Sequence, residues 1–221
     1  MLKGVDECLN IPSDTVTINE ENRLVLINKI NKCEANGAFL DTGVMDQILS
    51  LLSCKEVHVF PTYSTIDGTN VPYFGKYAKK EKVAQPTKFI LIPLCNGCHF
   101  NGYVNGYVIN YGKRDSLYRP KCTSRRSMGV NLANQFCSSI DDVKFTSYYK
   151  TRVQTDGNSC GAWLIAGMLG YVLNTSEEYR ILDRDDAFNV MFVMVEALNV
   201  KEKFSKVKQI FKYKLAMPNQ V

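Results

Sequence analysis

The strongest chemical signal in the sequence is a cysteine placed where a polar loop runs into an apolar stretch. Cys160 ends the segment Gln-Thr-Asp-Gly-Asn-Ser-Cys and is followed by Gly-Ala-Trp and further apolar residues. This pattern predicts a thiol at or near the N-terminus of a helix, where the helix dipole and free backbone N–H groups favour the nucleophilic thiolate. The same N–H groups, with the side-chain amide of Gln154 six residues earlier, can bind a developing oxyanion. A buried structural cysteine at a helix start is the competing interpretation.

The chain has two histidines as candidates for the general base of this thiol. His99 follows the apolar run 89–94, so we expect it at the end of a rigid strand, which holds an imidazole in a fixed orientation. His58, between two valines, is typical of an ordinary strand residue. Asp115 lies sixteen residues after His99 and can orient the imidazole, with Asn110 as a second candidate for that third role. Taken singly, a hydrogen-bonded structural histidine and a surface aspartate are the competing interpretations.

His99 also belongs to a Cys-x-x-Cys-His pattern that it forms with Cys95 and Cys98. This is the attachment signature of c-type haem, which would make the chain an electron carrier. Against haem, the pattern lies between two strand-like runs and not at a helix, and no export signal accompanies it. As half of a zinc site, the two cysteines need two further ligands, with His58 as one candidate, at a spacing that zinc sites do not typically use. We therefore expect neither a metal nor a cofactor.

The helices that would position these groups follow from the spacing of apolar residues. Acidic residues before the run 23–27 predict a helix start. The next helix is expected to be capped by Asp41 or Thr42. Beyond the first, helices are expected at 42–52, from Cys160 onward, at 184–198 and at 202–213.

Strand-like patterns occupy the middle of the chain. Residues 88–94 form a continuous apolar run, which is typical of a buried central strand. Residues 100–111 are rich in Tyr, Val and Ile but interrupted by glycines, which indicates one bent strand or two short ones. Further strands are expected at 56–61 and 141–149. The order helices, strands, helices predicts an α+β domain with a central mixed sheet flanked by helices.

Length, charge and cysteine usage limit the class of protein. A chain of 221 residues suits one domain with a sizeable core. The formal charge of +5 is modest, and the basic stretches 76–82 and 113–126 carry no groove-reading motif, so nucleic acid is not an expected partner. We expect no membrane span and no secretory signal, because no apolar run is long enough and the first residues lack an apolar region. The eight scattered cysteines are then expected to be reduced, as in the cytoplasm.

The four candidate groups occur in the order His99, Asp115, Gln154, Cys160. This order resembles the ubiquitin-like-protein proteases of clan CE, which include SUMO-deconjugating enzymes, the adenovirus maturation protease and bacterial effector deubiquitinases. The resemblance rests on the segment Gln-x-Asp-Gly-x-Ser-Cys-Gly with its spacing of six, on the triplet Asp-Ser-Leu, and on the apolar strand before the histidine. It covers about residues 88–171.

The resemblance implies a fold, a domain and a substrate site. It implies a single papain-like-related domain over residues 36–221, with the nucleophile at the N-terminus of a buried helix and residues 1–35 as a helical extension packed on the domain. The family usually has tryptophans that clamp the glycine tail of the substrate in a narrow tunnel, whereas this chain has Phe39 and Phe100 at the matching places. We therefore expect Phe39 and Phe100 to form a clamp of altered shape, and Trp163 is also expected to bind substrate.

The resemblance also implies an activity and its partners. The activity is isopeptide cleavage by a Cys-His-Asp mechanism through a thioester, and the partners are conjugates of ubiquitin or a ubiquitin-like protein. The protein is expected to act as a monomer in the cytoplasm, or in the cytosol of a host if it is a secreted effector. Alternatives within the clan are a viral-type maturation protease and an acetyltransferase effector, which typically carries Glu where this chain has Asp115. A binding module with a dead site is the non-enzymatic alternative.

Overall fold

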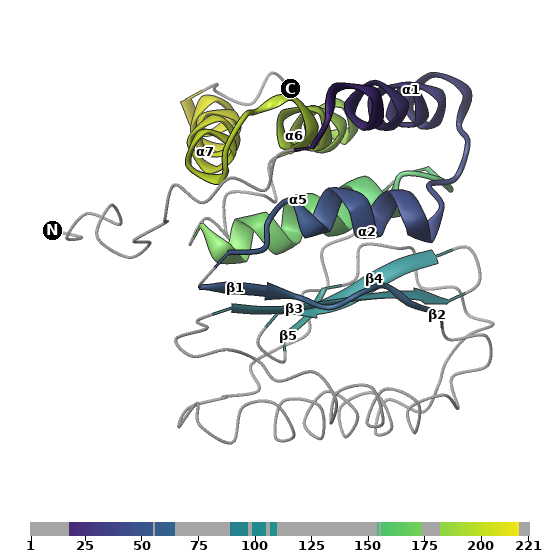
Figure 1. The fold of residues 1–221 in the computed structure, drawn as a ribbon, viewed down its shortest axis with the longest axis horizontal. Coiled ribbons are helices and arrows are strands. Elements are labelled where there is room, and N and C mark those ends of the chain that lie inside the picture. The colour runs from purple at the N-terminus through teal and green to yellow at the C-terminus, as the bar shows by residue number, and fades with distance from the viewer. Residues whose placement is uncertain are drawn as a thin grey trace, which may run out of the picture.

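The computed structural model describes residues 18–54, 56–64, 89–96, 99–104, 107–109, 154, 156–173 and 182–216. In the described chain, helices come first, strands follow and helices close the sequence, so the expected α+β class is confirmed. Figure 1 shows these elements in layers, with a small sheet, helices lying against one of its faces, and further helices beyond them.

The sheet is built around the continuous apolar run, which forms its longest described strand. The strands are β1 (Val57–Val59), β2 (Tyr63–Ser64), β3 (Phe89–Asn96), β4 (His99–Val104) and β5 (Tyr107–Ile109). β1 and β2 pair with β3 in parallel, whereas β4 pairs antiparallel with both β3 and β5. The sheet is therefore mixed, with the order β1-β3-β4-β5. The segment 100–111 gives two short strands, and the strand expected at 141–149 lies outside the described residues.

The described helices begin close to the residues at which the sequence predicted them. They are α1 (Glu20–Asn36), α2 (Thr42–Ser50), α5 (Cys160–Val172), α6 (Arg184–Glu196) and α7 (Val200–Ala216). At the start of α2, Asp41 Oδ1 accepts a hydrogen bond of 2.8 Å from the N–H of Val44. Asp41 is therefore the cap that α2 uses, because its carboxylate satisfies a backbone donor that has no partner within the helix.

Helix α5 lies between the sheet and the outer helices, which explains its lack of a polar face (Figure 1). It contacts β4 on one side and α6 on the other, and every residue from Cys160 to Gly170 is buried. A helix that is apolar all round must be covered all round. Within the described part of the chain, no helix is long and apolar enough to cross a membrane.

Helix α1 packs on α6 and contributes to the same hydrophobic core as the rest of the described chain. It buries Leu26, Ile30 and Cys33, whose spacing of four and three residues places them on one face of the helix. The helix runs across the division that the sequence analysis placed between residues 35 and 36. The N-terminal helix is thus packed on the other elements. The division into an extension of residues 1–35 and a domain of residues 36–221 stays a prediction.

Lys203 on α7 is a charged residue that the fold buries almost completely, since it is 1% exposed. Burial lowers the pKa of its ammonium group, although the nearby carboxylate of Glu202 opposes this shift. A lysine whose folded pKa is lowered destabilises the fold at neutral pH, because the charged form is favoured in the unfolded chain. We expect Lys203→Met to raise the free energy of unfolding by about 1 kcal/mol and Tm by about 2–4 °C. Thermal unfolding at neutral pH checks this, with the half-exposed Lys206→Met as control; a lower Tm for Lys203→Met contradicts it.

Candidate active site

Cys160 is the first residue of α5, where its sequence setting predicted a helix start. It is 1% exposed, and its Sγ lies 3.4 Å from the backbone nitrogen of Phe100, whose N–H donates to the sulfur. An N–H donor and the positive end of a helix both stabilise negative charge on a thiol. The position therefore has two of the features that make a cysteine nucleophilic.

The contact with Phe100 joins two segments that are sixty residues apart. β4 begins at His99, which lies opposite Asn96 on β3. Among the described residues, β5 pairs with β4 over Gly102–Val104. Phe100 lies before this pairing, and its N–H is directed to the thiol. Because the nitrogen of Phe100 is bonded to the carbonyl carbon of His99, the backbone of His99 begins one covalent bond from the atom that contacts Cys160.

The other expected catalytic groups are described only in part. The side chain of His99, and Asp115 and its alternative Asn110 altogether, lie outside the described residues. The structure thus brings Cys160 to the backbone of His99. The roles of the imidazole and of the carboxylate stay predictions.

Gln154 is buried in the loop that leads to Cys160, with 4% of its surface exposed. Its Nε2 donates to the backbone carbonyl oxygen of Asp156 at 3.1 Å and to Oδ1 of the same residue at 3.2 Å. Two acceptors on one side of the amide identify that side as the nitrogen, and Oε1 is buried without a hydrogen-bond partner among the described residues. The amide N–H groups are therefore directed at Asp156, and an oxyanion role requires that one of them also reaches the substrate.

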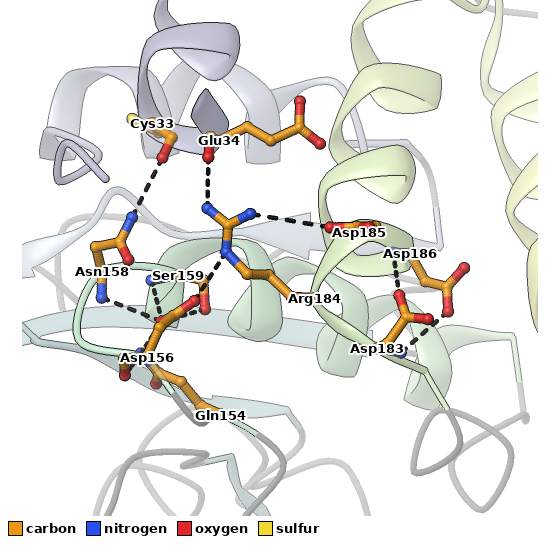
Figure 2. A network of polar contacts seen from close by, with 10 residues as sticks. All are labelled: Cys33, Glu34, Gln154, Asp156, Asn158, Ser159, Asp183, Arg184, Asp185 and Asp186. Carbon is orange, nitrogen blue, oxygen red and sulfur yellow. Dashed lines mark hydrogen bonds and ion pairs between the residues drawn. The ribbon is translucent and has the colours of Figure 1, made fainter. Parts of the chain in front are cut away.

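The carboxylate of Asp156 is the centre of this loop, as Figure 2 shows. Its Oδ1 accepts from the backbone N–H of Ser159 at 2.9 Å, from the Ser159 hydroxyl at 2.7 Å and from the backbone N–H of Asn158 at 3.2 Å. Burial by itself raises the pKa of this carboxyl group, but the hydrogen bonds from Ser159, Gln154 and Asn158 outweigh it and lower the pKa below its ordinary value. The carboxylate is therefore charged at neutral pH and holds the turn that ends at Cys160.

We expect Asp156 to stabilise the fold at neutral pH and not in acid. Because its folded pKa lies below the ordinary value of 3.8, the stabilisation is complete above that value and is lost as the pH falls through the lowered folded pKa. Asp156→Asn should therefore lower the free energy of unfolding at pH 7 by about 1–3 kcal/mol. Urea unfolding between about pH 7 and pH 3 should show that the difference in the free energy of unfolding between Asp156→Asn and the unmodified protein decreases as the pH falls. A difference that stays constant contradicts the assignment.

The three aromatic residues expected to bind substrate differ in exposure. Phe39 is 55% exposed, whereas Phe100 and Trp163 are 3% and 2% exposed. Trp163 is the fourth residue of the buried helix α5 and belongs to the hydrophobic core. Its role in binding substrate stays a prediction. Phe100 is buried likewise, and it meets Cys160 through its backbone. Of the three, Phe39 alone offers its ring to a partner.

Phe39 lies in the short connection between α1 and α2, close to the end of α5 that carries the thiol. Its neighbour Leu40 is buried, and a Cβ added at Gly161 would lie 3.5 Å from Leu40 and 3.0 Å from the sulfur of Met45. The connection between the helices therefore packs directly against the residue that follows Cys160. The exposed ring of Phe39 is one residue away from that contact.

Two residues of the Cys-x-x-Cys-His pattern lie on the paired strands β3 and β4, whereas Cys98 lies outside the described residues. Cys95 is on β3, and His99 is the first residue of β4. The position between strands, which argued against haem attachment, is therefore what the structure has. Among the described residues, four cysteines are outside disulfide bonds, namely Cys33, Cys54, Cys95 and Cys160.

Two functional candidates, Asp156 and Arg184, were not singled out from the sequence. Asp156 lies within the segment that carries the family resemblance, and an aspartate three residues before a helix cap is a known turn signal that could have found it. Arg184, which contacts Asp156 in Figure 2, begins a helix that starts 24 residues after Cys160. No local pattern in the sequence connects it to Cys160.

Comparison with known proteins finds no match to this chain among protein-family models, curated proteins or solved structures. The resemblance to the clan CE proteases therefore stays a hypothesis that rests on the motifs.

Proposed function

We propose that this chain is a cysteine isopeptidase of the clan CE type, which removes ubiquitin or a ubiquitin-like modifier from its conjugates. The observation that carries the proposal is the 3.4 Å contact between Cys160 Sγ and the N–H of Phe100. It joins the helix start that ends the glutamine-to-cysteine motif with the strand that begins at His99. Two motifs that occurred in the sequence by chance are not expected to be in contact in the folded protein.

The chemistry is acyl transfer through a thioester. His99 accepts the proton of Cys160, and the sulfur bonds to the carbonyl carbon of the terminal glycine of the modifier. The oxyanion is stabilised at the N-terminus of α5, with Gln154 as the side-chain donor. The C–N bond then breaks as His99 returns its proton to the leaving lysine amine, and water cleaves the C–S bond to restore the thiol. Asp115 orients the imidazole.

The burial of the thiol favours a substrate whose reactive end is thin. Cys160 is 1% exposed, and a glycine tail has no side chains that would collide with the surroundings of a buried sulfur. The 55% exposed ring of Phe39, one residue from the wall that packs on Gly161, provides apolar surface near that end of α5. Both features fit the Gly-Gly tail of ubiquitin-like proteins.

A panel of modifiers tests the proposal, each carrying an electrophile in place of its terminal carboxylate. The panel contains ubiquitin, SUMO and related modifiers, and it is reacted with the unmodified protein, with Cys160→Ala and with Cys54→Ala. Cys54 is a matched control because it is a free thiol that is more exposed than Cys160. We expect a mass shift with one modifier that is lost in Cys160→Ala and kept in Cys54→Ala.

The other outcomes are informative as well. If folded protein reacts with no modifier, the deconjugase proposal is contradicted, and acetyl-CoA turnover and viral-type peptide substrates become the next assays. If the shift persists in Cys160→Ala, the nucleophile is another of the eight cysteines.

A further inference from the structure

A charged bridge links the loop before Cys160 to the start of α6 and the end of α1, which are distant from it in sequence (Figure 2). Oδ2 of Asp156 accepts from Nε of Arg184 at 2.9 Å, which leaves Oδ1 for the donors of the loop before Cys160. The guanidinium continues to α1, where its terminal nitrogen donates to the carbonyl oxygen of Glu34 at 2.7 Å. The loop makes a second bond to α1, from Nδ2 of Asn158 to the carbonyl oxygen of Cys33 at 3.2 Å.

The end of α1 needs the partners that the bridge provides. The last four carbonyl groups of a helix receive no hydrogen bond from an N–H within the helix, and they carry the negative end of the helix dipole. α1 has no basic residue of its own in its last turn. Arg184, at the start of α6, supplies a positive charge and a hydrogen-bond donor at this end of α1. Gly37 closes the helix in the left-handed conformation, with φ of 65°, and a Cβ at that position would lie 3.8 Å from Nδ2 of Asn158.

The bridge is shielded and geometrically restricted, which separates it from an ordinary surface ion pair. The side chains of Arg184 and Asp156 are 31% and 25% exposed. The guanidinium carbon of Arg184 also lies 4.7 Å from the ring centroid of Phe188, so this ring covers one face of the guanidinium plane. Removing one member of such a pair leaves a partly buried charge and several hydrogen-bonding groups without partners.

We propose that Asp156 and Arg184 are positioning residues, which hold the Gln154–Cys160 loop on the end of α1 and thereby fix the thiol against β4. The opposite wall is supplied by Leu40 and Met45, which meet the helix at Gly161. Cys160 and the loop before it are thus held from two sides, by these apolar side chains on one side and by the charged bridge on the other. This inference deepens the proposed function. The measurement of modifier turnover rests on that function, whereas the measurement of Cys160 alkylation does not.

Two readouts separate positioning of the thiol from stabilisation of an oxyanion. Alkylation of a thiol by iodoacetamide is a displacement at carbon in which sulfur replaces iodide, so no oxyanion forms. A residue that only places an oxyanion donor therefore affects reaction with a modifier substrate and leaves alkylation unchanged. A residue that positions the thiol affects both.

The variants are Asp156→Asn, Arg184→Met and Arg184→Lys, with Asp185→Asn as the matched control. Asp185 also faces Arg184, at 3.9 Å, but its side chain is 80% exposed. In Asp156→Asn and Arg184→Met, alkylation of Cys160, followed by peptide mass mapping, should be about tenfold slower, which is the effect of losing a hydrogen bond to a charged group. Turnover of the modifier substrate should fall about 100-fold, as for a displacement of about 1 Å. Arg184→Lys should lie between, because one ammonium cannot serve both acceptors, and Asp185→Asn should match the unmodified protein.

Cys54 provides the internal reference in every sample, because general loosening of the fold would speed its alkylation. A slower reaction at Cys160 with an unchanged reaction at Cys54 supports positioning. Unchanged alkylation of Cys160 in Asp156→Asn and Arg184→Met overturns it, whether or not turnover falls. If the unmodified protein turns over no modifier at all, the proposed function fails, while the alkylation rates still decide on the bridge. If Arg184→Met does not fold, Arg184→Lys decides in its place.

Discussion

Replacement of His99 by alanine is expected to lower kcat/KM for the modifier substrate by about 1,000-fold or more. The strand β4 begins at His99, and the next backbone N–H contacts the Cys160 sulfur at 3.4 Å. The proposed mechanism assigns to the imidazole of His99 the role of accepting the proton of this thiol. Without it, the thiol loses the general base that the proposed mechanism assigns to it.

The matched control is the second histidine of the chain. His58 lies on β1, where its ring meets that of Phe60 edge-on at a centroid distance of 4.6 Å. His58→Gln should keep turnover within about threefold of the unmodified protein, since a substitution away from the site has a small effect. If His99→Ala and His58→Gln lower turnover equally, His99 has no catalytic role. The pH dependence of kcat/KM provides a second check, because the limb that reports the base should disappear in His99→Ala.

Replacement of Gly102 by valine is expected to destabilise the fold by about 3 kcal/mol or more, with a fall in Tm of about 6–12 °C. A Cβ at Gly102 would lie 2.6 Å from Cε of Met168, 2.7 Å from the backbone oxygen of Ile92 and 3.2 Å from Leu164. The methionine end can rotate away, but the backbone oxygen belongs to the neighbouring strand and cannot. β4 must therefore move away from β3, and the contact between Phe100 and Cys160 is disturbed with it.

Gly157 is the control for Gly102, because a Cβ there meets nothing within 4 Å. Gly157→Ala should leave Tm within about 2 °C of the unmodified protein, as expected for an exposed site without contacts. Thermal unfolding and the alkylation rate of Cys160 should both change in Gly102→Val. A Gly102→Val protein with unchanged Tm would mean that the sheet and α5 are not packed as closely as the structure has them.

Local patterns were sufficient to predict most described elements of the fold. The apolar run at 88–94 became β3, and the continuous apolar stretch after Cys160 became the buried helix α5. Such patterns work because burial selects side chains by their spacing along each element. The two-residue strand β2 was missed, since two residues carry no period and pair only because β3 lies beside them.

Within the candidate site, the sequence by itself determined the chemical groups. It placed Cys160 at a helix start and His99 at a strand end, because loop polarity and apolar periodicity are local properties. Only the tertiary structure decided which groups meet. The N–H of Phe100 reaches the thiol, Trp163 is withdrawn into the core, and Arg184 joins the nucleophile loop to the end of α1. Each of these contacts depends on how separate elements pack, and no single stretch of sequence carries that information.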